Sequence, residues 1–435
     1  MDKKFTLTLI GFLLGTAVGS VAGAWFGLLA VVGGLLPKRF RWLALGVAIG
    51  LIKAVITLPV VDYLPPLGKN VALTGIVVNE VAVRDNYQQF NLETAGFAKP
   101  LLVSASMYPA VSYGQRWKGE GKLVDDRFRK GMAGTPIGLF KAKTVTTVDT
   151  NDLSIIQQGL KQLLSFKSYL ISLTNQLWPE PSSSLVAGIL WGGRASLDKK
   201  VQTDFQLAGV SHTLAVSGYN VTILLAGIAS VLPWLGINRK QNVPVLLSIL
   251  FCFVLITGAS AAVVRAGIMG SIAVLGKQLG RPMAIGRVLL VTASVMAILN
   301  PFVLIYDVGF QLSFLATVGL VYITPLLEPH LTRLPEYFGL KENLTSTLSA
   351  TIATLPVIVF NFGLISLVAP LANILILWSI PYTMALSAIA IAGGMVWLPL
   401  GKIIAWPSLF LLKYVVWIIS WCAGLPYAYI DVNKL

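Results

Sequence analysis

The 435-residue chain has few of the side chains that build metal or covalent catalytic centres. It contains two histidines, His212 and His330, and two cysteines, and none of them lies in a cluster with the spacing of metal ligands. Cys252 and Cys422 both fall in apolar stretches, which favours packed thiols over a disulfide framework. A Gly-x-x-x-x-Gly-Lys-Ser/Thr loop for nucleotide phosphates is also missing. We therefore expect no metal and no cofactor, and any driving force must come from outside the chain.

Charged residues are scarce as well. They make up 12% of the chain, whereas 56% of the residues are hydrophobic and the mean hydropathy is +0.78. This composition excludes an ordinary soluble protein and indicates a membrane protein. The net charge is +15, of which residues 62–204 contribute +4 and the remaining, mostly apolar, part +11. Basic loops between spans give any multi-span protein such an excess, so the charge alone does not identify a nucleic-acid partner.

The apolar runs predict eleven membrane spans, at residues 5–20, 22–36, 42–61, 207–236, 243–260, 262–277, 286–299, 302–327, 345–366, 369–397 and 403–424. The first 36 residues imitate a secretory signal, but the apolar character continues to Leu36, which favours two short spans over a cleaved segment. Basic loops, such as the one with Arg239 and Lys240, should face the cytoplasm. With an internal N-terminus, the segment after the third span and the C-terminus should then lie outside, at the cell membrane.

Residues between the third and fourth spans have different patterns. In 62–150, alternating segments at 70–78, 89–94 and 101–105 are separated by Gly, Asp and Asn turns, which predicts a small β-barrel of about five strands. In 151–204, residues 153–178 form an amphipathic pattern typical of an interfacial helix. The apolar run at 184–192 is too short to cross a bilayer and is either interfacial or re-entrant. We therefore divide the chain into segments 1–61, 62–150, 151–204 and 205–435.

Residues 209–221, Gly-Val-Ser-His-Thr-Leu-Ala-Val-Ser-Gly-Tyr-Asn-Val, place polar side chains in an apolar stretch. Such groups are costly in lipid unless they find partners or water, so the segment marks a functional region. His212, Ser217 and Asn220 could hydrogen-bond across the bundle, near the helix-breaking Gly218, or line a pore. A Ser/His hydrolase is a weaker hypothesis, because five residues place His212 and Ser217 about 140° apart on a continuous helix.

Two charges fall inside the predicted spans. Asp307 is the single acid between Phe205 and Leu327, and Arg265 lies in an apolar run. Each costs about 2.5–3.5 kcal/mol at the bilayer centre on insertion scales. They could form an ion pair that locks the bundle, or Arg265 could lie on a water-filled path. Lys53 and Lys413 either extend to an interface or join Arg265 in a cationic interior that would suit a polyanion.

Segment 209–221, together with residues 190–197, resembles the signature of the ComEC-type competence protein family of membrane channels. The likeness runs from about residue 60 to the C-terminus and has two departures: Asn220 replaces the second histidine of the family, and Gly193 replaces the acidic residue of the preceding turn. Further pieces match in order, namely Arg265 and Ala266 with Met269, residues 309–314 (Gly-Phe-Gln-Leu-Ser-Phe), residues 354–356 (Thr-Leu-Pro), and Asn373 with Pro381.

The resemblance implies a polytopic α-helical membrane protein with a small extracytoplasmic, OB-like β domain. It implies import of single-stranded DNA across the cytoplasmic membrane during natural transformation. Many relatives carry a C-terminal domain like a metallo-β-lactamase. We expect none here, either because the protein relies on a separate nuclease or because this is a truncated form, and we therefore expect a transport protein and no enzyme. A separate motor, DNA receptor and nuclease would be its partners, and homo-oligomerisation stays open. The translocation path would contain His212, Ser217, Asn220, Arg265, Asp307, Gln311 and Ser313.

The β domain carries candidate contacts to a DNA strand, because aromatic rings stack on bases and cations follow phosphates. Each group also has an alternative role that involves no DNA. The aromatic rings could fill the barrel core, and the charged side chains could be solvated at the surface. Two functional alternatives also remain: a transporter for another anionic solute, and a membrane-embedded hydrolase. The candidate DNA contacts are Arg116, Trp117, Lys118, Arg127, Arg129 and Lys130.

Overall fold

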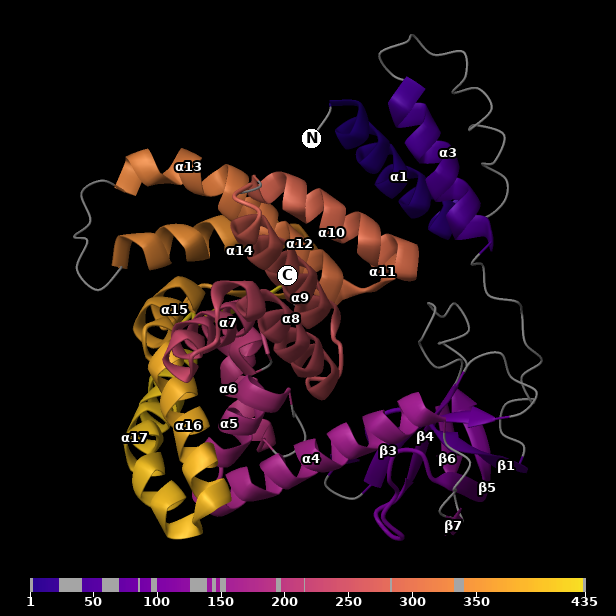
Figure 1. Ribbon diagram of the computed structural model, residues 1–435, viewed down its shortest axis with the longest axis vertical. Helices are drawn as coiled ribbons and strands as arrows, with labels where there is room; N and C mark the ends of the chain where they lie inside the picture. Colours follow the sequence, from indigo (N-terminus) through magenta and orange to yellow (C-terminus); the bar gives the residue numbers. More distant parts are fainter. Residues whose placement is uncertain are drawn as a thin grey trace. The chain divides into compact units, whose positions relative to one another are not determined.

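The computed structural model describes residues 3–22, 41–56, 70–84, 87–94, 100–125, 139–142, 146–148, 154–192, 197–214, 216–281, 284–331 and 340–432. The chain forms two compact units. Figure 1 shows their helices and strands, coloured by position in the sequence. The first contains Met1–Ser168 and Ser294–Tyr306, and the second contains Tyr169–Ala293 and Asp307–Leu435.

The β domain of the first unit is a closed five-stranded barrel. Its order is β1-β3-β4-β6-β5, and antiparallel pairing of β1 with β5 closes the ring. β4 and β6 are parallel, whereas the other neighbours are antiparallel. The three strands predicted from sequence alternation are confirmed as β1, β3 and β4. The strands are β1 (Asn70–Val77), β3 (Tyr87–Thr94), β4 (Leu101–Ser106), β5 (Arg116–Asp125) and β6 (Leu139–Ala142), with β2 (Ala82–Arg84) pairing with β3 and β7 (Thr146–Val148) with β5.

Alternate residues of these strands fill the barrel. Trp117 lies at the centre, with its ring edge-on to Phe90 at 5.8 Å and to Phe140 at 6.3 Å between centroids. All three side chains are at most 1% exposed. Aromatic pairs of this geometry stabilise a core by about 0.5–1.5 kcal/mol beyond their area burial.

Two glycine-rich helices, α1 (Lys3–Ala22) and α3 (Arg41–Ile56), pack closely in the first unit. A Cβ atom added at Gly11, Gly15, Gly46 or Gly50 would clash with a backbone carbonyl oxygen of the other helix. This small-xxx-small arrangement lets helix backbones approach in lipid. α1 matches the span predicted at 5–20, whereas most of the span predicted at 22–36 lies outside the described residues.

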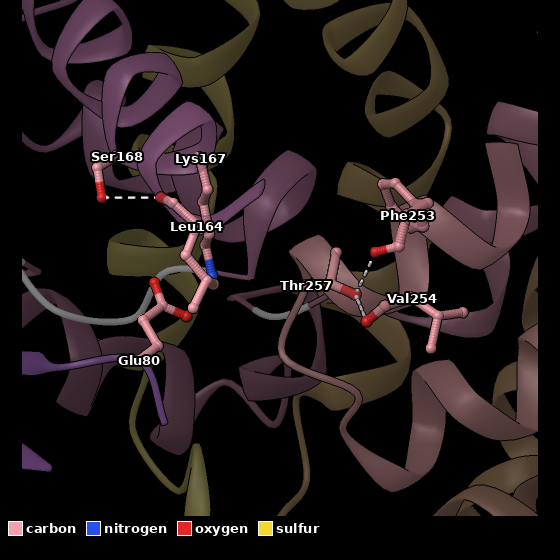
Figure 2. A network of polar contacts seen from close by, with 7 residues as sticks. All are labelled: Glu80, Leu164, Lys167, Ser168, Phe253, Val254 and Thr257. Carbon is pink, nitrogen blue, oxygen red and sulfur yellow. Dashed lines mark hydrogen bonds and ion pairs between the residues drawn. The ribbon is translucent and has the colours of Figure 1, made fainter. Parts of the chain in front are cut away.

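Helix α4 (Ile155–Leu177) agrees with the amphipathic helix predicted at 153–178. Within the first unit, Lys167 of α4 extends its ammonium to Glu80, with Nζ and Oε2 2.5 Å apart (Figure 2). The Lys167 side chain is 2% exposed, and the carboxylate beside it offsets the cost of burying its charge. The loop before β2 is thereby tied to the helix that follows the barrel.

The second unit is helical. Five stretches among the described residues are long and apolar enough to cross a bilayer: 218–235, 308–331, 341–362, 379–396 and 398–423. They confirm a polytopic α-helical membrane protein but not the predicted total of eleven spans. The helices are α5 (Ser182–Trp191), α6 (Lys199–Leu207), α7 (Gly218–Val231), α8 (Arg239–Ile256), α9 (Ala261–Gln278), α10 (Ile285–Leu299), α12 (Val308–Val318), α13 (Thr324–Leu327), α14 (Leu340–Phe362), α15 (Ala369–Leu377), α16 (Ser379–Val396) and α17 (Leu398–Ala423); α10 continues into the first unit, which also holds α11 (Val303–Tyr306).

The core of this unit forms where α5 packs against α16 and α17. Nine of the ten residues of α5 are buried, so this helix is enclosed by protein and does not lie on a surface. With ten residues it is about 15 Å long, half the thickness of the hydrocarbon layer. Both predictions for 184–192, a re-entrant and an interfacial segment, therefore concern a helix that is packed inside protein. In the turn between α4 and α5, the Trp178 indole donates to Ser408 Oγ at 3.0 Å.

Several predicted spans differ from the observed helices. The span predicted at 302–327 breaks at Asp307, and the one at 369–397 breaks at Trp378, between α15 and α16. The span predicted at 345–366 is too long, because Gly363 has a φ of +64° and ends α14. The chain then forms β8 (Leu364–Ser366), which pairs with β9 (Tyr429–Asp431). Hydropathy measures an apolar run and does not detect such breaks.

Candidate functional site

The polar segment 209–221 is a break between two helices. α6 ends at Leu207, and Gly209 follows with a φ of +70°. The Val210 N–H then bonds back to the Phe205 carbonyl at 2.9 Å, in the manner of a left-handed helix end. A single 3₁₀ turn, Ser211–Leu214, precedes the start of α7 at Gly218. The predicted span 207–236 is therefore not continuous, and the apolar helical stretch long enough to cross a bilayer begins at Gly218.

Ser217 and Asn220 hold the first turn of α7 in place. Ser217 Oγ accepts a bond from the Asn220 N–H at 3.4 Å and donates to Asn220 Oδ1 at 3.1 Å. Asn220 Nδ2 donates to the Ile189 carbonyl of α5 at 3.1 Å, and the Asn220 side chain is buried. Asn220 thus bonds to a neighbouring helix, whereas Ser217 bonds only within the first turn of α7.

His212 lies in the 3₁₀ turn and is exposed. Both His212 and Ser217 belong to the described residues, and no hydrogen bond joins them. Ser217 is instead engaged with Asn220. A nucleophilic serine needs a base within hydrogen-bond reach, so this geometry gives no support to the hydrolase alternative.

Arg265 of α9 lies where α7, α9 and α12 meet. A Cβ atom added at Gly218 would lie 3.0 Å from Arg265 Nη2, so glycine at this position leaves room for the guanidinium. Nη1 donates to Thr317 Oγ1 of α12, and the guanidinium carbon lies 5.9 Å from the centre of the Phe314 ring. The buried Nε atom has no hydrogen-bond partner.

The predicted ion pair between Arg265 and Asp307 is wrong. Both residues are described, and no salt bridge joins them. Asp307 instead caps α12, with Oδ1 accepting from the Phe310 N–H at 2.9 Å. Thr317, which does contact Arg265, is ten residues further along the chain, a distance of about 15 Å in a regular helix. Asp307 caps the N-terminal end of α12, whereas Arg265 contacts Thr317 near the C-terminal end.

The surroundings of Arg265 favour an anion. Its guanidinium lies at the N-terminal end of α7, where the helix dipole is positive and a second positive charge is unfavourable. No described carboxylate pairs with it. An anion placed here would meet the guanidinium fork at the positive end of the α7 dipole, although the Asn220 N–H is already bonded to Ser217 Oγ.

The remaining predicted path residues, Gln311 and Ser313, lie on α12 and are partly buried. Gln311 is one turn after Asp307, and the Ser313 carbonyl accepts a bond from Thr317 Oγ1 at 3.0 Å. Sequence reasoning missed Phe314 and Thr317. The signal was available, because positions 311, 314 and 317 recur at the three-residue spacing of one helix face.

On the barrel, Arg116 and Lys118 are exposed on the outer face of β5. Trp117 is 0% exposed in the core, so it presents no surface on which a base could stack. Sequence reasoning counted Lys122 among the basic residues of the barrel but missed Lys141, which is exposed and lies directly opposite the exposed Lys122 in the β5–β6 register. Like charges in such a pair repel each other unless an anion lies between them. Arg127, Arg129 and Lys130 lie outside the described residues.

No metal centre emerges from the described residues: three or more His, Cys, Asp or Glu side chains do not come together anywhere among them. Cys252 and Cys422 are both free thiols, and Cys422 is packed inside the second unit as predicted, whereas the prediction of a packed thiol is wrong for Cys252, which is exposed. The candidate site therefore consists of a cation, a helix start and neutral polar groups.

Comparison with known proteins matches this helical region. Residues 189–435 match the family model described as competence protein. Over 233 residues the chain is 30% identical to ComE operon protein 3 of Bacillus subtilis (strain 168), an alignment that covers 53% of this chain and 29% of that relative. No solved structure matches the chain. Because the family match covers more than half of the chain, including the broken helix and Arg265, the chain belongs to the ComEC-type competence protein family.

Proposed function

We propose that this chain is a membrane conduit for DNA uptake, through which a single strand of DNA enters the cell during competence. The position of Arg265 carries the proposal. Its guanidinium lies against the start of α7 at Gly218, next to a break between two helices, and none of the described carboxylates pairs with it. A path for a polyanion needs cationic positions of this kind, whereas a proton relay needs several carboxylates.

In this proposal Arg265 binds the phosphate groups of the strand one after another. Thr317 and Phe314 orient the guanidinium, and each phosphate in turn replaces water at the guanidinium and at the first N–H groups of α7. Conduction requires binding that is favourable enough for entry and weak enough for release. A single cation without a second charged partner meets that requirement better than a cluster would. His212, exposed in the adjacent turn, lies on the same path.

The barrel gathers the strand before it enters the membrane. We assign it to the OB type, which the five-stranded closed barrel with its single parallel pair supports. OB domains bind oligonucleotides on the second and third strands and on the connecting loops, including the loop between the fourth and fifth strands. Here β5 and β6 are the fourth and fifth strands of the barrel. Segment 126–138 between them contains Arg127, Arg129 and Lys130.

Phosphate contacts on the barrel come from four exposed cations of β5 and β6. They are Arg116, Lys118, Lys122 and Lys141. In this proposal the barrel and the C-terminus face the outside of the cell membrane, and a separate motor, DNA receptor and nuclease complete the pathway. A cysteine introduced at Tyr108, which is 81% exposed, would then react with an impermeant thiol reagent added to intact cells. Labelling only after cell lysis would mean that the barrel faces the cytoplasm, the opposite of the proposed orientation.

The test of the proposal is DNA uptake in cells that lack their own conduit. Complementation with the wild-type chain should restore entry of a labelled strand into the cytoplasm. Arg265→Gln should reduce entry by at least about tenfold, the effect of losing a charged contact of about 1.5–3 kcal/mol. Arg265→Lys, which keeps the positive charge, should retain part of the wild-type uptake. Lys413→Gln removes an exposed cation from α17 and should leave uptake unchanged. Wild-type uptake by a normally inserted Arg265→Gln chain would refute the proposed role.

A further inference from the structure

A second candidate site is a cavity of about 470 Å³ between α7, α8 and α9. Its walls are apolar and built from small residues, with Ala226 and Ala229 on α7 and Gly270 and Ala273 on α9. Apart from Thr222, whose hydroxyl donates to the Gly218 carbonyl, its polar groups lie at one end, where α7 and α9 finish and α8 begins: Lys277 and Gln278 on α9, and Asn242 on α8. The cavity thus combines a long apolar part with a short polar end.

The polar end lacks a partner. Asn242 Oδ1 is buried and accepts no hydrogen bond, which leaves an acceptor in need of a donor. Lys277 is exposed beside it and supplies a positive charge. The start of α8, held by a capping box between Asn238 and Gln241, adds the positive end of a helix dipole. An occupant should therefore carry an anion for Lys277 and an O–H or N–H group for Asn242.

The same end of the three helices has the features of a membrane interface. Trp234, in the turn between α7 and α8, is 90% exposed, and Leu235 beside it is 68% exposed. Arg281 follows α9 and is also exposed. Tryptophan and basic residues gather at the level of lipid headgroups, and basic residues gather on the cytoplasmic side.

We propose that this cavity is a binding site for an anionic phospholipid of the phosphatidylglycerol type. One acyl chain lies along Ala226, Ala229 and Ala273. The phosphate oxygens accept from Lys277 Nζ, and a glycerol hydroxyl donates to Asn242 Oδ1. Basic pockets between helices at the cytoplasmic leaflet hold lipid headgroups by the same chemistry. The occupied site would fasten α8 and α9, and therefore Arg265, to α7.

The proposal is tested by native mass spectrometry of the purified, delipidated full chain, titrated with phosphatidylglycerol, phosphatidylcholine or inorganic phosphate. We expect one high-affinity phosphatidylglycerol per chain and a weaker phosphatidylcholine complex. Lys277→Gln should weaken phosphatidylglycerol binding about fivefold and abolish the preference, since one basic residue near a headgroup contributes about 1 kcal/mol. Lys277→Arg should retain the preference. Ala226→Phe, which fills the apolar part, should weaken both lipids.

Lys402→Gln, which removes an exposed cation from α17, is the matched control and should bind phosphatidylglycerol like the wild type. Equal binding of both lipids to the wild-type chain, or full preference in Lys277→Gln, would refute the site. Displacement of the lipid by inorganic phosphate would also refute it, because the ligand would then be a free anion. None of these outcomes depends on DNA uptake, so the site can stand or fall apart from the proposed conduit.

Discussion

At the scale of single residues, the candidate site depends on one glycine. Gly218 starts α7 and has no side chain where the Arg265 guanidinium lies. The sequence pointed to both residues, because a glycine after polar groups predicts a helix break and an arginine in an apolar run is costly. It did not predict that they meet, since 47 positions separate them and only the packing of α7 on α9 brings them together.

Gly218→Ala should reduce DNA uptake without unfolding the chain. The added Cβ atom would lie 3.0 Å from Arg265 Nη2, so the guanidinium must shift by a few tenths of an ångström. Gly227→Ala in the same helix is the control, because nothing lies within 4 Å of its added Cβ. Uptake is measured at equal levels of membrane-inserted protein. If both variants import DNA at the wild-type rate, the close contact has no functional role.

At the scale of elements, strands and long helices were predictable, and so was the break near Gly218, but the interruptions at Asp307 and Trp378 were not. Period-two alternation predicted β1, β3 and β4, because one face of each strand fills the barrel around Trp117. Asp307 was interpreted as an ion-pair partner, whereas it caps α12. An acid directly before an apolar helical run predicts an N-cap. This interpretation should be considered for any acid that is otherwise assigned to an ion pair inside the membrane.

The opposed lysines of β5 and β6 give a prediction for the barrel. If Lys122 and Lys141 contact phosphates, the double variant Lys122→Gln/Lys141→Gln should bind an oligothymidine more weakly. It should also flatten the plot of log affinity against log salt by about 1.4, or about 0.7 per lost contact. Lys161→Gln, which removes a cation from α4, should leave the slope unchanged. An unchanged slope in the double variant would mean that these lysines are only solvated.

At the scale of the whole molecule, composition established the membrane class, and the resemblance to a family supplied the substrate. The low content of acids, histidines and cysteines argued against a metal centre or a carboxylate relay, but it could not choose among anions. The arrangement around Arg265 is compatible with an anion, and the proposal that this anion is a phosphate of DNA rests on the family. Phe314 and Thr317 complete the site, although no charge or rare residue type distinguished them in the sequence.

The central claim is that a DNA strand passes Arg265, and the most direct measurement is photocrosslinking during uptake. A photoreactive benzoylphenylalanine replaces Phe314, whose ring centre lies 5.9 Å from the guanidinium carbon, and cells receive labelled DNA before illumination. The same residue at Phe410, which is 61% exposed on α17, is the control. We predict a covalent DNA adduct at position 314 and none at position 410. Import of DNA without an adduct at position 314, or equal adducts at both positions, would contradict the claim.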